Sequence, residues 1–207
     1  MITPHHILYN LALLDGKKKD GEGQLEDNKT SVNKMTWAIA LGAFFPDSFT
    51  FLFFLIYGLL FSMPHEKMWD DIYFNSGWNI IFSVAHSLWL LPLLALLSFL
   101  WKKRNLMYFF LSAVLHTSMD FFVHADDAYR HFYPFSNYKF FSPISYYDSH
   151  FYGNYISILT HIAAIVSLFI LQRRFKERGN KKLMYICLAG GILEILVVIV
   201  LISMLIR

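Results

Sequence analysis

Long apolar stretches alternate with short polar segments along most of the chain. An α-helix needs about 20 apolar residues to cross the hydrocarbon core of a bilayer. Five stretches approach or exceed that length, and each is predicted to form a membrane-spanning helix: 35–62, 78–101, 105–123, 151–172 and 183–206. Pro46 and Asp47 interrupt the first stretch, where we expect a kink or a break.

The first 14 residues are apolar but too few to span a bilayer. They lack the basic start and the small-residue cleavage site of a signal peptide, so we expect them to be retained as a short re-entrant or interfacial helix. The sequence has no internal repeat and no domain boundary. It therefore predicts one all-α domain over residues 1–207, a multi-pass transmembrane helical bundle.

The composition supports a membrane protein. Hydrophobic residues make up 56% of the chain and charged residues only 16%, against roughly 25% charged residues in a soluble domain. Cys187 is the one cysteine, which excludes an internal disulfide and a thiolate metal site. The lysines and arginines fall between the apolar stretches and form no basic stripe, so nucleic acid is not an expected partner.

The distribution of lysine and arginine predicts the topology. Segments 15–34, 102–104 and 173–182 carry five, three and six of these residues, whereas segments 63–77 and 125–150 carry one and two. By the positive-inside rule the first three are cytoplasmic. Segment 125–150 is then extracytoplasmic, and its aromatic residues and two prolines predict an ordered cap on the membrane surface.

Residues that can bind metal are concentrated between positions 116 and 134, HTSMDFFVHADDAYRHFYP. His116, Asp120 and His124 are spaced four apart and share one face if the helix continues; Asp127 and His131 repeat the spacing. Imidazole and carboxylate groups on one face are suitable ligands for Zn²⁺ or a pair of divalent ions.

The depth of polar residues in their spans indicates a shared site. At a rise of about 1.5 Å per residue, Asp47 lies roughly 20 Å, His116 about 17 Å and Asp120 about 23 Å from the cytoplasmic ends of their helices. His86, counted from the other side, reaches nearly the same depth. Ionisable groups at such a depth cost several kcal/mol unless paired or bound to metal. These four residues are our predicted metal ligands, and interhelical polar contacts are the alternative.

Four residues of the following segment could complete a second metal site, or could form a solvated loop that caps the third span: His124, Asp126, Asp127 and His131. Arg130 beside them suits a bidentate phosphate contact, although a loop salt bridge would explain it equally well. His161 and Glu194 lie near mid-depth in the last two spans, and we interpret them as interhelical hydrogen-bond partners.

Several short motifs occur in an order that resembles a known family: HILY at 6–9, Pro46-Asp47, HSL at 86–88 and LHTSMD at 115–120. The family is that of the predicted membrane-bound metal-dependent hydrolases of the bacterial inner membrane, some of them labelled LexA-binding. It looks distantly similar to zinc-dependent phospholipase C and the single-strand nucleases. The resemblance implies a metal role for His6, with His5 a bystander. The His-Arg-Gly-x-Thr motif usual before the family's His-Ser is replaced here by IFSVA.

Together the ligand pattern and the resemblance predict a membrane-embedded hydrolase that cleaves a phosphoester of a lipid or amphiphilic substrate by metal-activated water. One or two ions are expected, zinc first and manganese or iron as alternatives. Asp126 or Asp127 would act as general acid or base, and Arg130 would stabilise developing charge.

Two other classes of function remain open on the sequence. A transporter would use the buried aspartates, histidines and Glu194 to carry ions or protons. A haem protein would use His86, His116 and His161 as axial ligands.

Overall fold

The structure is a computed structural model that describes residues 1–16, 28–64, 66–73 and 76–206. The expected all-α fold is confirmed over these residues. The α-helices are α1 (Thr3–Leu14), α2 (Asn28–Phe53), α3 (Trp78–Ala85), α4 (Leu90–Leu100), α5 (Arg104–Phe121), α6 (Gly153–Glu177) and α7 (Lys181–Leu205). Shorter π- or 3₁₀-helices are η1 (Phe54–Leu60), η2 (Lys67–Tyr73) and η3 (Ser149–Phe151).

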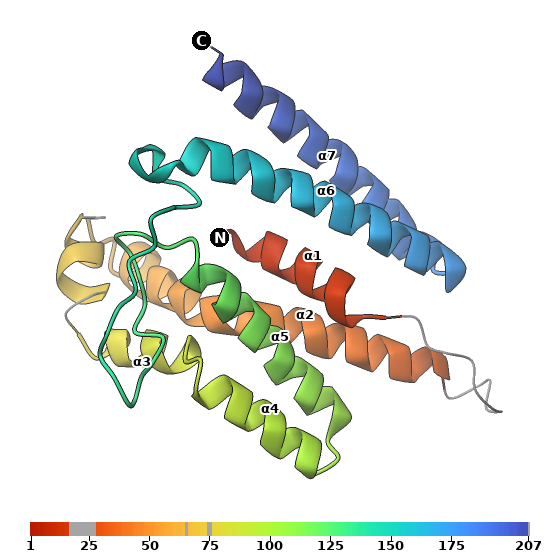
Figure 1. Ribbon diagram of the computed structural model, residues 1–207, viewed down its shortest axis with the longest axis horizontal. Coiled ribbons are helices and arrows are strands. Elements are labelled where there is room, and N and C mark those ends of the chain that lie inside the picture. Colours follow the sequence, from red (N-terminus) through yellow and green to blue (C-terminus); the bar gives the residue numbers. More distant parts are fainter. Residues whose placement is uncertain (17–27, 65, 74–75, 207) are drawn as a thin grey trace.

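The short helix α1 occupies the middle of the bundle. Figure 1 shows it between the antiparallel pair α6–α7 and the pair α2–α5, with α4 alongside α5. The segment between α5 and α6 covers the end of the bundle where α3 lies (Figure 1), and two hydrogen bonds attach it there. Ser87 Oγ donates to the carbonyl of Tyr133 at 2.6 Å, and the Leu88 amide donates to the carbonyl of His131 at 2.8 Å.

A buried ion pair fixes the C-terminal end of α1. The carboxylate of Asp15 is fully buried and accepts two hydrogen bonds from Arg178, the residue directly after α6, at 2.8 and 3.1 Å. Arg174 of the same helix donates to the Asp15 carbonyl at 2.7 Å. Arginine with a carboxylate in this forked geometry is among the stronger charge-assisted pairs. The contacts hold α1 in register with α6.

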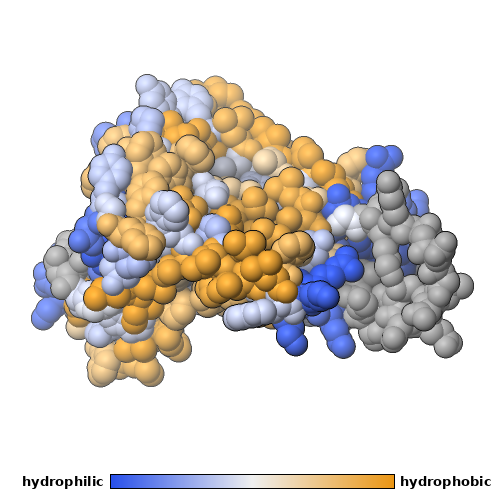
Figure 2. Space-filling model, turned by 60° about the horizontal axis from the view of Figure 1, so that its bottom comes forward, coloured by the Kyte–Doolittle hydropathy of each residue, from blue (hydrophilic) through white to orange (hydrophobic). Residues whose placement is uncertain are grey.

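The prediction of five membrane spans is wrong: within the described residues three helices are long and apolar enough, Lys34–Leu60, Gly153–Glu177 and Lys181–Leu205. A fourth exists if α3 and α4, bent by 49°, count as one broken span. The predicted span 105–123 corresponds to α5, which is not among them because its inner face is polar. Figure 2 shows hydrophobic residues over the middle of the visible face and hydrophilic residues towards its ends, as expected of a protein in a bilayer.

Of the kink or break expected at Pro46, the break is wrong: helix α2 continues past Pro46 to Phe53, where the π-helix η1 prolongs it. Proline removes only one backbone hydrogen bond, and packing of α2 along α5 and α1 keeps the helix together. The polar composition of segments 15–34 and 63–77 predicts loops, but η2 lies within segment 63–77 and α2 starts within segment 15–34. Residues 17–27 lie outside the described part.

Helices α2 and α5 approach so closely that side chains of α5 bond to backbone carbonyls of α2. Ser112 Oγ donates to the Ile39 carbonyl at 2.6 Å, and one turn later His116 Nδ1 contacts the Ala43 carbonyl at 2.7 Å. Gly42 permits this approach, because a Cβ atom there would lie 2.0 Å from the carbonyl oxygen of Phe109. The absence of one side chain therefore sets the distance between the two helices.

We predict that Gly42→Ala destabilises the protein by about 2 kcal/mol or more, since the helices must separate to admit the methyl group. Thermal unfolding of the detergent-purified protein measures the effect. Gly191→Ala in α7 is the control, because no atom lies within 4 Å of a Cβ there. Equal unfolding temperatures for the two variants would contradict the proposed role of Gly42.

Candidate metal centre

Four side chains from three parts of the fold converge inside the bundle. They are Asp47 of α2, His86 directly after α3, and His116 and Asp120 of α5. One ligand atom from each lies within 4.8 Å of all the others. His86, His116 and Asp120 are at most 1% exposed. The structure thus brings together the four residues that were expected to lie at a similar depth in their predicted spans.

The spacing of these atoms suits a single small cation. His116 Nε2 lies 3.0 Å from Asp120 Oδ2 and 3.5 Å from Asp47 Oδ1. His86 Nε2 lies 3.9 and 4.0 Å from the same two oxygens. Ligands about 2.0–2.1 Å from a tetrahedral zinc ion are about 3.3 Å apart, so the observed separations bracket the required one.

Backbone carbonyls determine which nitrogen of each histidine faces the centre. His116 Nδ1 lies 2.7 Å from the Ala43 carbonyl, and His86 Nδ1 lies 3.0 Å from the Phe82 carbonyl. A carbonyl only accepts, so each Nδ1 carries the proton, and in the neutral ring each Nε2 carries a lone pair. Both Nε2 atoms are buried and form no hydrogen bond within the described residues. Metal-binding histidines are oriented by this kind of contact.

Asp120 presents its two oxygens to two groups of histidines. Oδ2 faces His86 and His116, whereas Oδ1 lies 2.9 Å from His6 Nε2 and 3.4 Å from His124 Nε2. The amino group of Met1 also contacts Oδ1, at 2.8 Å. The ring of His6 stacks on that of His116 with centroids 3.7 Å apart. His6 and His124 therefore border the group of four residues that could hold an ion.

His131 is buried near the centre but outside it. Its ring contacts Phe121 and Tyr129, and neither ring nitrogen has a hydrogen-bond partner within the described residues. Burial lowers the pKa of His131 to about 4, so its imidazole is neutral at neutral pH. Helix α5 ends at Phe121, near the predicted end of this stretch at residue 123, so His124 and His131 do not continue its polar face.

The three residues predicted to be catalytic lie at different distances from the ligands. Asp127 Oδ2 contacts His124 Nδ1 at 2.8 Å, which connects it to the border of the centre. Asp126 is exposed and accepts a hydrogen bond from Tyr147. Arg130 donates to Ser83 at 3.0 Å and to Asn137 at 3.1 Å. Their catalytic roles stay predictions.

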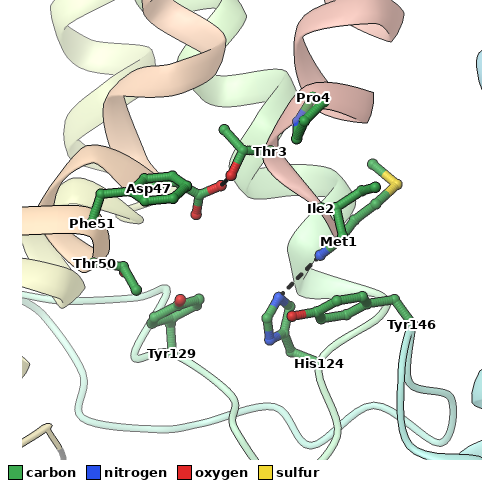
Figure 3. Close-up of a pocket in the computed structure, with 10 residues that line it drawn as sticks. All are labelled: Met1, Ile2, Thr3, Pro4, Asp47, Thr50, Phe51, His124, Tyr129 and Tyr146. Carbon is green, nitrogen blue, oxygen red and sulfur yellow. Dashed lines mark hydrogen bonds between the residues drawn. The ribbon is translucent and has the colours of Figure 1, made fainter. Parts of the chain in front are cut away.

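A cavity of about 300 Å³ opens beside the centre, and Figure 3 shows the residues that line it. Asp47 and His124 are among them, with Phe51, Tyr129 and Tyr146 forming aromatic walls. The hydroxyl of Thr3 donates to Asp47 Oδ2 at 2.5 Å (Figure 3). The volume is at the lower end of the range for small-molecule sites. A small ligand in this cavity would touch Asp47, one of the four converging residues, and His124, which borders them.

Spacing and depth along the chain do not point to some of the residues around the centre. Thr3 bonds to Asp47, and Tyr129 stacks on His86 with ring centroids 3.9 Å apart. His161, which a haem site would need, contacts Glu194 instead of His86 or His116.

No family model matches the chain, and neither a curated protein nor a solved structure matches it. The resemblance to membrane-bound metal-dependent hydrolases therefore stays a prediction. What the fold contributes is a buried set of histidines and aspartates that could hold a metal ion.

We predict that the double variant His116→Gln, Asp120→Asn loses the ion held by this centre while the protein stays folded, because both replacements are neutral and similar in size. Elemental analysis of the detergent-purified protein, combined with size-exclusion chromatography, measures both properties. His150→Gln is the control, since that side chain is 88% exposed and its Nδ1 contacts Asp148, a residue outside the centre. Unchanged metal content in the double variant would refute the assignment.

Proposed function

We propose that this protein is a metal-dependent hydrolase of the bacterial inner membrane that cleaves a phosphoester in a lipid or another amphiphilic molecule. One observation carries the proposal: at the edge of a cavity, two carboxylates face two buried histidine nitrogens that have no hydrogen-bond partner among the described residues. Buried polar atoms are nearly always satisfied, so such a group of atoms requires an explanation. A bound cation provides it.

Asp47, His86, His116 and Asp120 would hold the ion, and two imidazoles with two carboxylates favour Zn²⁺, with Mn²⁺ or Fe²⁺ as alternatives. When bound, a divalent ion lowers the pKa of water and polarises a phosphoryl oxygen. The hydrogen bonds from each Nδ1 to a backbone carbonyl keep the rings oriented before and during the reaction.

His124 is our candidate for the proton-transferring group. Its ring lines the cavity, and its Nδ1 contacts Asp127 at 2.8 Å. A carboxylate in that position orients the imidazole and stabilises its charged form, so Nε2 could accept a proton from water. Asp127 would then act through His124 as a positioning residue. Asp126 and Arg130 would require a change of side-chain conformation to take part.

The expected topology supports a lipid substrate. With the lysine- and arginine-rich segments in the cytoplasm, the segment between α5 and α6 and the cavity beside it belong to the extracytoplasmic half of the membrane. Substrate would enter from the outer leaflet. The aromatic walls of the cavity suit the apolar part of such a molecule next to its phosphate.

We predict that zinc- or manganese-loaded protein releases a water-soluble phosphorus-containing product from vesicles of phosphatidic acid or phosphatidylglycerol. Radiolabelled lipid phosphorus in the aqueous phase measures the reaction. Activity should disappear in the His116→Gln, Asp120→Asn variant, and His124→Gln should lower kcat by about 100-fold or more with little change in KM.

The control for both variants is again His150→Gln. Folded, metal-loaded protein that hydrolyses neither lipid would contradict the proposal. Proton or metal flux through the same protein in liposomes would then favour a transporter.

A further inference from the structure

A second cluster of polar side chains lies on the side of α1 away from the candidate metal centre. It consists of His5 of α1, His161 of α6 and Glu194 of α7, and one ligand atom from each lies within 4.8 Å of the others. His5 is fully buried. Consecutive residues of a helix point about 100° apart. His5 therefore faces this cluster while His6, its neighbour, faces Asp120 of the first.

Glu194 bridges the two histidines. Its Oε1 lies 3.4 Å from His5 Nε2, and its Oε2 lies 2.5 Å from His161 Nδ1. The two imidazole rings meet edge to face with centroids 4.6 Å apart. His5 Nδ1 is buried and forms no hydrogen bond within the described residues. The cluster thus contains a buried nitrogen to which the described part of the chain offers no hydrogen-bond partner.

The position of Glu194 makes its charge costly. It lies near the middle of α7, a candidate membrane span whose described residues are mostly exposed and apolar. A carboxylate at that depth costs several kcal/mol unless a cation compensates it. The cation could be the proton shared with His161 or a metal ion that replaces it.

We propose that His5, His161 and Glu194 form a second site for a divalent transition metal, separate from the centre at Asp120. Two imidazoles and one carboxylate are a ligand set of zinc and non-haem iron sites that keep an open position. Magnesium and calcium prefer oxygen ligands and do not fit it. Metal binding releases the proton between His161 and Glu194. The proposal does not depend on hydrolysis at the first centre.

The test is a count of ions in the full-length, detergent-purified protein equilibrated with zinc and then desalted. We expect two ions per chain in the wild type, one in Glu194→Gln and one in His116→Gln, Asp120→Asn. Glu177→Gln, an exposed residue at the end of α6, is the control. The same ion count in Glu194→Gln and the wild type would overturn the proposal. His5, His161 and Glu194 would then be hydrogen-bonded side chains that hold no metal.

X-ray absorption spectroscopy of the His116→Gln, Asp120→Asn variant provides a second measurement in case Glu194→Gln does not fold. Two imidazole ligands around the remaining zinc support the site, whereas absence of bound zinc overturns it. The two centres can fail independently. If the wild type holds one ion, and that ion is lost in Glu194→Gln but kept in His116→Gln, Asp120→Asn, the first centre is refuted and the second is supported.

Discussion

The close contact between α2 and α5 is the constraint on which the metal centre depends. Without a side chain at Gly42, α5 comes near enough for Ser112 and His116 to bond to carbonyls of α2 one helical turn apart. The same register, continued by another turn, brings Asp47 opposite Asp120. A packing contact thus places two carboxylates of different helices together, which electrostatic repulsion alone would oppose.

Buried charge is the second feature that organises the bundle. Asp120 and Glu194 sit on different helices with histidines around each, and the histidines His5 and His6 that approach them are neighbours on α1. This explains why so short a helix lies in the middle of the structure, where its C-terminal end is held by the ion pair of Asp15. A shift of α1 along its axis would disturb both clusters together.

The break between α3 and α4 shows how a polar residue can be accommodated inside an apolar segment. His86 lies at the bend, where its Nδ1 bonds to the Phe82 carbonyl and its ring stacks on Tyr129. Irregular backbone within a membrane is tolerated only where protein covers it or where it lines a cavity. The segment between α5 and α6 provides that cover, since it bonds to Ser87 and Leu88.

The sequence by itself determined the all-α class, the approximate positions of the long helices and the four residues that could hold an ion in the first centre, because apolar length and the depth of ionisable residues are local properties. Only the tertiary structure decided the number of candidate spans, the course of α2 through Pro46 and the partners of His5 and Glu194. Those outcomes depend on which helices lie side by side. Contacts across distant parts of the chain decide that arrangement, and hydropathy along the sequence does not record them.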